Sequence, residues 1–361
     1  MSSDIPNALR VAGGGLLAAG ALAAGAAAGA AIERAVMART SRPDTRSRSW
    51  ALEDFNAHEL EITMDDGTTL HVEIDEPEDP AKSAVTVIFA HGYALSLDSW
   101  YFQRRELHGR ARLVTYDQRS HGESGRGEFD THHVDQLGRD LGAIIDAVAP
   151  QGPLVLVGHS MGGMTIMALA EQRPELFADR VYGIALISTT AGGLRNAVLG
   201  LPPILGRMVM RVAPALTAAM ARQKELVERG RRTSSDLVLL ITRAYSFGSQ
   251  ASDEAARFVA QMINATPIDV LAEFLPALQE HDKRAVLPVL QQAEVLVIVG
   301  DTDRLTPMEH SREIVRAIPG AEFVVIENGG HMALIEFHEE VDRLIAGLLD
   351  RVWRDVAAGA T

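Results

Sequence analysis

One pentapeptide constrains the fold more than any other feature of the chain. Gly158-His159-Ser160-Met161-Gly162 fits the pattern G-x-S-x-G. It follows the apolar run 154–157, which is typical of a buried strand, and precedes a helical pattern over 161–172. A chain that passes directly from a buried strand into a helix turns sharply, and small residues at both ends of the turn let the backbone segments approach. The sequence therefore predicts a strand–turn–helix unit with the side chain of Ser160 exposed at its tip.

The same alternation of strand and helix extends along most of the chain. Alternation of this kind predicts an α/β fold with a mostly parallel, doubly wound sheet covered on both faces. Asp66-Gly67 between the first two strands indicates a hairpin, which adds an antiparallel edge. The strands are expected at 58–63, 68–75, 84–90, 112–116, 154–157, 184–187, 295–299 and 323–326, and the helices between them at 131–148, 161–172, 307–317 and 333–352.

The alternation stops over residues 191–285, where no strand is predicted. Helical patterns are found there near 203–229, 235–247, 253–264 and 269–279. We expect this segment to be a helical cap inserted between core strands, where it can cover a site. The expected core then consists of residues 50–190 and 286–361.

A serine nucleophile needs a base, and the base needs a carboxylate that orients it. Among the twelve histidines, His331 follows the loop signal Asn328-Gly329-Gly330 after a predicted strand. Asp303 comes just after the strand 295–299, and Asp301 is a rival acid in the same turn. The order Ser, Asp, His fits Ser160 as nucleophile, Asp303 or Asp301 as acid and His331 as base.

Backbone N–H groups are expected to bind the negative charge that develops during attack. His91-Gly92-Tyr93 ends the apolar strand 84–90, beside the predicted turn of Ser160 in a doubly wound sheet. We expect the N–H groups of Tyr93 and Met161 to form an oxyanion hole.

These motifs together identify the chain as similar to the α/β-hydrolase superfamily over roughly residues 55–350. The resemblance is strongest to its serine carboxylesterase and monoacylglycerol-lipase-like branch. In one departure, Ser120 occupies a position where the family usually has glycine. In another, the strand before the acid lacks its common proline. The motifs are HGY at 91–93, DQRSHGES at 117–124, GHSMGG at 158–163, GDTDRLTP at 300–307 and GGHM at 329–332. The resemblance implies Ser160 as the nucleophile, Asp303, the fourth residue of the G-x-x-D pattern, as the acid and His331 as the base.

The expected function is hydrolysis of carboxylic esters of small or medium-sized apolar substrates through an acyl-enzyme, with no cofactor and no metal. The chain has no cysteine, which excludes disulfides, thiolate zinc sites and cysteine nucleophiles. The same triad could serve an acyltransferase, a thioesterase, a C–C hydrolase or a cofactor-free haloperoxidase. A binding protein that retains the pocket is an alternative from another class.

Residues 1–49 differ in composition from the rest of the chain. Residues 11–32 carry no charge over 22 positions, long enough to cross a bilayer, although eleven are Ala and six are Gly. Five arginines follow this run and only Arg10 precedes it, a bias that predicts a membrane anchor with the catalytic body on the cytoplasmic side. A cleaved signal peptide, and therefore export, is one alternative, and a flexible low-complexity leader is the other.

Charge limits the partners of the body. Residues 1–49 hold six arginines and three acidic residues, a net charge of +3. Because the whole chain has a net charge of −14, residues 50–361 have a net charge of −17. A surface this acidic argues against nucleic-acid binding, which needs basic patches. We therefore expect a small-molecule ester as the partner, with membrane association through residues 11–32.

Overall fold

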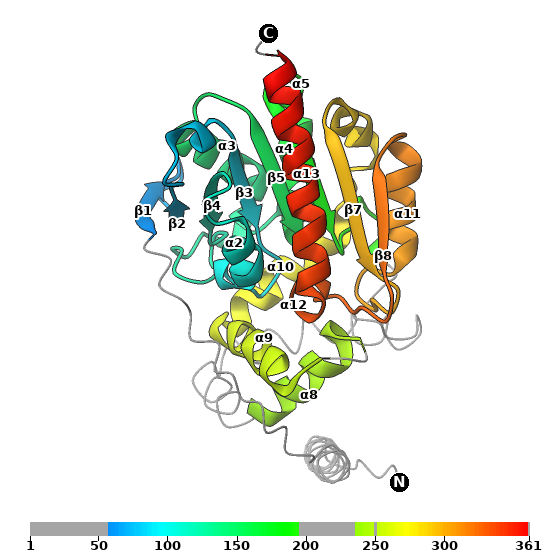
Figure 1. Ribbon diagram of the computed structural model, residues 1–361. Coiled ribbons are helices and arrows are strands. Elements are labelled where there is room, and N and C mark those ends of the chain that lie inside the picture. Colours follow the sequence, from blue (N-terminus) through cyan, green and yellow to red (C-terminus); the bar gives the residue numbers. More distant parts are fainter. Residues whose placement is uncertain (1–56, 195–234, 249–250, 360–361) are drawn as a thin grey trace, which may run out of the picture. The chain divides into compact units, whose positions relative to one another are not determined.

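A computed structural model describes residues 57–194, 235–248 and 251–359 (Figure 1). These residues belong to one compact unit, Trp50–Thr361. The predicted apolar segment and linker, residues 1–49, and the predicted cap helix over 203–229 lie outside the described residues.

Eight strands form one sheet in the order β1-β2-β4-β3-β5-β6-β7-β8. The pairings β1–β2 and β2–β4 are antiparallel, and all the others are parallel. The predicted fold class is therefore confirmed, including the antiparallel hairpin at the edge. The strands are β1 (His58–Thr63), β2 (Thr69–Asp75), β3 (Thr86–Ala90), β4 (Arg112–Tyr116), β5 (Leu154–His159), β6 (Val181–Ile187), β7 (Glu294–Gly300) and β8 (Glu322–Ile326).

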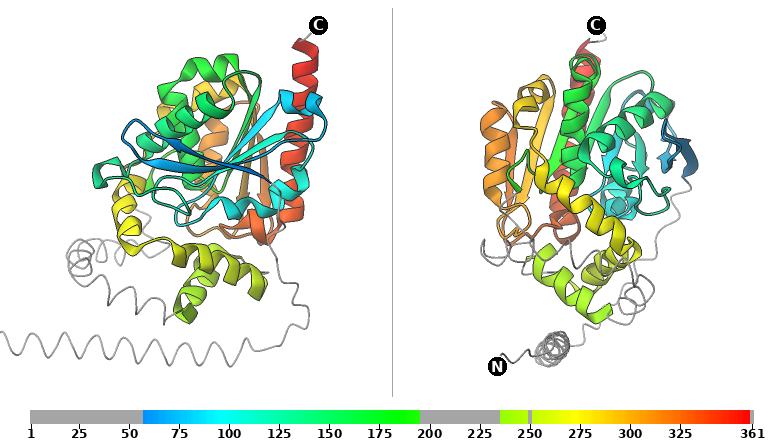
Figure 2. Two further views of the ribbon diagram at one scale, coloured as in Figure 1. Left: turned by 90° about the vertical axis from the view of Figure 1, so that its left-hand side faces the viewer. Right: turned by 180° about the vertical axis from the view of Figure 1, so that it is seen from behind.

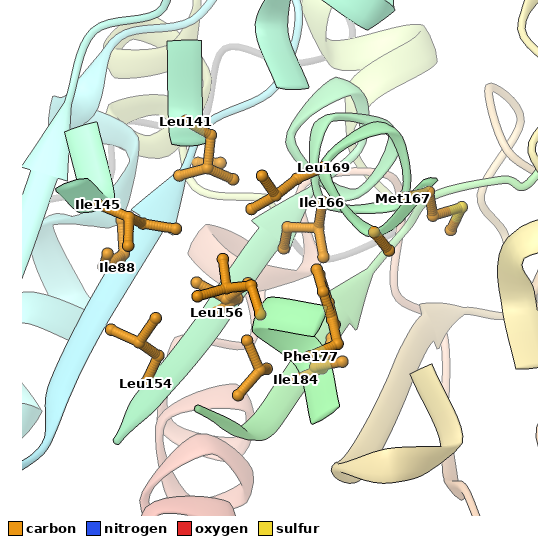
Figure 3. Packing of buried hydrophobic residues seen from close by; sticks show 14 of the residues in the cluster. Ile88, Leu141, Ile145, Leu154, Leu156, Ile166, Met167, Leu169, Phe177 and Ile184 are labelled. Carbon is orange, nitrogen blue, oxygen red and sulfur yellow. The ribbon is translucent and has the colours of Figure 1, made fainter. Parts of the chain in front are cut away.

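Both faces of the central strands are buried, which explains their continuous apolar sequences. Alternate residues of β3 and β5 point to opposite faces, so Ile88 and Leu156 join one hydrophobic cluster while Val87 and Val155 join the other. In Figure 3, side chains of α3 (Val134–Val148) and α4 (Met161–Gln172) pack onto the first of these faces.

The remaining helices complete two layers around the sheet (Figure 2). The face covered by α3 and α4 also receives side chains of α5 (Pro174–Asp179), α11 (Met308–Ala317) and the 3-10 helix η5 (Arg284–Gln292). The opposite face is covered by α2 (Tyr101–Leu107), α12 (Ala333–Glu336) and α13 (His338–Gly359). Three further short 3-10 helices are η1 (Pro80–Ala84), η2 (Leu97–Trp100) and η3 (Phe129–Thr131).

The helical segment between β6 and β7 contains α8 (Ser235–Ser246), α9 (Asp253–Ala265) and α10 (Ile268–Glu280) among the described residues. These helices lie beyond one end of the sheet (Figures 1 and 2). The two ends of the segment are joined at its base, where Lys283 N–H donates to the Ala191 carbonyl at 2.6 Å. The cap therefore starts and finishes at one place on the core.

Several boundaries differ from the predicted ones for local reasons. The helix expected over 333–352 is two helices, because the chain breaks at Phe337 between α12 and α13. The helix expected from 131 begins at Val134, where the His133 side chain caps it by accepting the N–H of Gln136 at 3.1 Å.

None of the described helices alone is long and apolar enough to span a membrane. Among them, only α9 and α10 taken together reach the required length and hydropathy, and this pair is bent by 95°.

Candidate active site

Ser160 lies at the sharp turn between β5 and α4. Its φ of 51° and ψ of −115° place a non-glycine residue in a strained conformation, and its side chain is half-buried while its neighbours are buried. A Cβ on Gly162 would lie 1.9 Å from the Ala90 carbonyl oxygen, and one on Gly158 would lie 2.6 Å from Gly162. The glycines therefore allow the start of α4 to approach the end of β3.

His331 and Asp303 meet across the ends of β7 and β8. The Nδ1 atom of His331 lies 2.9 Å from Oδ2 of Asp303, and the Thr306 hydroxyl donates to the same oxygen at 2.8 Å. The other oxygen, Oδ1, accepts the N–H groups of Leu305 and Thr306, both at 2.9 Å. Asp301, the rival acid, is exposed. The structure thus pairs His331 with Asp303.

The surroundings of Asp303 favour its ionised form. Burial alone would raise the pKa of this carboxyl, but the adjacent His331 and the hydrogen bonds from His331 and Thr306 outweigh burial, so the pKa lies below its usual value. Because Asp303 is then acceptor-only, Nδ1 of His331 donates to it; in the neutral imidazole, Nε2 is then the acceptor.

The backbone of His331 is held by His159, which directly precedes Ser160. His159 Nε2 lies 3.0 Å from the His331 carbonyl oxygen, and a carbonyl can only accept, so His159 carries its proton on Nε2. Burial, with the nearby His331, lowers the pKa of His159 to about 3, which keeps the ring neutral. Within the described ranges, no hydrogen bond joins Ser160 Oγ directly to His331.

The loop after β3 is fixed from the core side. His91 donates from Nδ1 to the Gly92 carbonyl at 2.8 Å, and its Nε2 accepts the N–H of Gln118 at 2.9 Å. The Gln118 side chain in turn accepts the hydroxyl of Thr165 in α4 at 3.0 Å. This network connects the Tyr93 loop to the helix that follows Ser160.

The N–H groups of Tyr93 and Met161 make no hydrogen bond with any part of the chain that the structure describes. Met161 lies at the first position of α4, where backbone N–H groups have no partner within the helix. Both N–H groups are thus able to donate to a bound ligand.

Tyr93 also touches the cap through its side chain. Its hydroxyl donates to the carbonyl of Leu271 in α10 at 2.5 Å. Val270 and Phe274 of the same helix form a buried cluster with Met161, against which Tyr93 packs. The cap therefore contacts both residues whose N–H groups we expected in the oxyanion hole, a connection that the sequence pattern did not reveal.

Ser120, which replaces a glycine of the family pattern, adopts a left-handed φ of 66°. Its hydroxyl oxygen lies 2.8 Å from His132 Nε2 and accepts the N–H of Gly127 at 3.0 Å. These two bonds offset the strain that a side chain normally incurs at positive φ. His133, the next residue, caps α3, whereas His132 is buried at 3% exposure.

Over the described ranges, no group of three or more His, Asp or Glu side chains is arranged to hold a metal ion. The structure thus brings the His331–Asp303 pair next to His159, the neighbour of the strained Ser160.

Comparison with known proteins identifies the family of this chain. Residues 85–337 match the family described as alpha/beta hydrolase fold, so the chain belongs to this family and is an enzyme of the α/β-hydrolase superfamily. It is 26% identical to 3-oxoadipate enol-lactonase 1 of Acinetobacter baylyi, over 82% of this chain and 98% of that protein.

Two further similarities cover different shares of the partner proteins. The solved structure of a thermophilic esterase from Thermogutta terrifontis has a TM-score of 0.62 and 26% identity, covering 82% of this chain and 99% of the esterase. The dihydrolipoyllysine-residue acetyltransferase component of the acetoin cleaving system of Pseudomonas putida is 27% identical over 74% of this chain. The chain spans only 64% of that protein's length.

Proposed function

We propose that this protein is a serine hydrolase that cleaves carboxylic esters of small or medium-sized apolar substrates through an acyl-enzyme. The observation that carries the proposal is that both the ring and the backbone of His331 are fixed, the backbone by the residue next to the strained Ser160. Asp303 holds the His331 ring at 2.9 Å, and His159, the neighbour of Ser160, holds its backbone at 3.0 Å.

The first half-reaction follows from the tautomer of His331. With its proton on Nδ1 toward Asp303, His331 accepts the Ser160 proton at Nε2 while Oγ attacks the ester carbonyl carbon. The direct hydrogen bond between the two side chains then forms in the complex with substrate, as is common for catalytic pairs. Asp303 stabilises the resulting imidazolium.

The N–H groups of Tyr93 and Met161 bind the oxyanion of the tetrahedral intermediate. The intermediate collapses when His331 returns the proton to the leaving alcohol, and Ser160 retains the acyl group. His331 then activates a water molecule that attacks the acyl-enzyme, releases the acid and restores the Ser160 hydroxyl. No step needs a cofactor or a metal.

Apolar surroundings support an uncharged substrate. Met161 belongs to a buried apolar cluster with Leu137, Val270 and Phe274, and Tyr93 packs against this cluster. One similar protein is named an esterase and another an enol-lactonase, and a lactone is a cyclic ester, so both names support cleavage of an ester bond here. Identity near 26% leaves the alcohol and acyl groups to be found by experiment.

The test combines a fluorophosphonate probe with a panel of p-nitrophenyl esters of increasing acyl length and a set of lactones. We expect covalent labelling of Ser160 and hydrolysis that is fastest for one range of chain lengths. Labelling without hydrolysis of any ester, but with turnover of acyl thioesters or transfer to added alcohols, would favour a thioesterase or an acyltransferase. Absence of labelling in the folded protein would favour a binding protein and contradict the proposal.

A further inference from the structure

The last residue of α12, Glu336, joins the cap to the loop that carries His331. Its Oε2 atom accepts the N–H of Gly330, directly before His331, at 2.9 Å. The same oxygen accepts the N–H of Gly248, which follows α8 of the cap, also at 2.9 Å. Hydrogen bonds to a carboxylate are roughly twice as strong as those between neutral groups. One side chain therefore links two segments that are far apart in the sequence.

The two segments are in direct backbone contact at this point. Met332 N–H, directly after His331, donates to the Ser246 carbonyl at 2.7 Å. A Cβ on Gly330 would lie 2.3 Å from the carbonyl carbon of Phe247, and one on Gly248 would lie 1.9 Å from the Asn328 carbonyl oxygen. The glycines at 248 and 330 are thus required because the cap closely approaches the loop 328–332, which we call the histidine loop.

The histidine loop needs external bonds to have a single conformation. Gly329 and Gly330 precede His331 without regular secondary structure, and glycine has the largest backbone freedom of any residue. Thr302 fixes the Gly329 carbonyl through its N–H at 3.0 Å and its hydroxyl at 2.7 Å. Glu336 supplies the bond at the next residue, Gly330.

We propose that Glu336 is a positioning residue for His331. By holding Gly330 and Gly248 on one oxygen, it fixes the histidine loop against the cap and so keeps Nε2 of His331 in reach of Ser160. Its proposed action is indirect, through the backbone of Gly330, which directly precedes His331. The inference rests on the proposed serine mechanism, and it makes the position of the base depend on cap docking.

Three substitutions separate the reach of this side chain from its charge. Glu336→Gln keeps an acceptor oxygen at the same distance from the backbone, Glu336→Asp keeps the charge but is one methylene too short to bond both N–H groups, and Glu336→Ala removes the oxygen. For a short activated ester, we expect kcat to fall at least ~10-fold in the Asp and Ala variants and no more than ~3-fold in the Gln variant, with KM changed less than ~3-fold. Glu339→Ala, on the exposed surface of α13, is the matched control.

Hydrogen–deuterium exchange of residues 328–332 gives a second readout that does not depend on turnover. Exchange should accelerate in Glu336→Asp and stay close to the unsubstituted protein in Glu336→Gln; this pair decides the matter if the Ala variant does not fold. Equal kcat in the Asp and unsubstituted proteins, or an equal loss in Asp and Gln, would overturn the inference. Failure of the fluorophosphonate to label Ser160 would instead overturn the proposed function, whatever Glu336 does.

Discussion

Asp303 binds His331 through the same oxygen, Oδ2, that accepts the Thr306 hydroxyl, while its other oxygen is occupied by two backbone N–H groups. Four hydrogen bonds therefore fix the orientation of this buried carboxylate. The fixed carboxylate in turn gives the ring of His331 one favourable orientation. Asp301, two residues earlier, is exposed and takes no part in this arrangement.

Replacing Asp303 by an amide should therefore lower kcat far more than the same replacement of Asp301. We expect Asp303→Asn to lower kcat about 10²–10⁴-fold, because an amide can donate to His331 and favour the wrong tautomer. Asp301→Asn should change kcat less than ~3-fold. Steady-state hydrolysis of one activated ester by both variants makes the comparison, and the reverse ranking would show that the other carboxylate orients the base.

Buried neutral histidines should make the fold labile in mild acid. Burial lowers the pKa of His91 and His159 to about 3 and that of His121 to about 4. Between roughly pH 6 and 4 the unfolded chain therefore binds protons at these sites and the folded protein does not, so stability falls as the pH falls. Each such site contributes about 1.4 kcal/mol per pH unit.

Three carboxylates, Asp98, Asp117 and Asp342, act in the opposite sense, because burial raises the pKa of each. Burial raises the pKa of Asp117 to about 6, so in the same window the folded protein keeps a proton that the unfolded chain releases. His132 and His281 are two further histidines whose pKa burial lowers to about 4. Because five such histidines outnumber the carboxylates with a raised pKa, we expect a net uptake of protons on unfolding near pH 5. Urea unfolding at several pH values measures it. His121→Phe should reduce the uptake by about one, and an unchanged slope would contradict the assigned protonation states.

Tyr93→Phe should weaken the docking of α10 while leaving the backbone N–H in place. The lost hydrogen bond to the Leu271 carbonyl is worth about 1 kcal/mol, or roughly fivefold in an equilibrium. We expect kcat/KM for the preferred acyl length to fall about fivefold and the chain-length preference to flatten, because α10 packs behind Met161. Tyr182→Phe, a half-buried tyrosine on β6, is the control. A uniform loss across all chain lengths would argue against a role for this contact in selectivity.

Local sequence predicted the elements whose patterns are carried by neighbouring residues. The buried strands are apolar on both faces, and the turn at Ser160 has its glycines at fixed positions. Both features can therefore be predicted from short segments of sequence. The short helix α5 also left a signal, Pro174 followed by Glu175 at its start, which the prediction passed over. The break at Phe337 had no such signal.

The contacts that support the site could not be predicted in this way. Glu336 on Gly248, and Tyr93 on Leu271, join residues that lie far apart in the sequence and carry no shared motif. Ser120 shows the difference. The family pattern identifies its position as one that usually holds glycine, which agrees with the observed φ of 66°. The hydrogen bonds that let a serine occupy this position depend on His132 and Gly127 and could not be predicted from the pattern.

The N-terminal residues lie outside the described part of the chain, and the anchor stays a prediction. Five larger aliphatics among 22 uncharged residues make insertion marginal, since each contributes only about −0.3 to −0.6 kcal/mol at the centre of a bilayer. We expect the full chain to pellet with membranes and resist carbonate, and a variant that starts at Trp50 to remain in the supernatant with equal activity on a soluble ester. Recovery of an exported enzyme that lacks residues 1–30 would identify a signal peptide instead.

The most direct test of the account is the turnover of Ser160→Ala, measured together with the mass of the fluorophosphonate adduct in the unsubstituted protein. We predict that kcat for an activated ester falls at least ~10³-fold in the folded variant, and that the adduct maps to Ser160 alone. A folded Ser160→Ala protein that hydrolyses the ester at the unsubstituted rate, or an adduct on another residue, would contradict the assignment of Ser160 as the nucleophile.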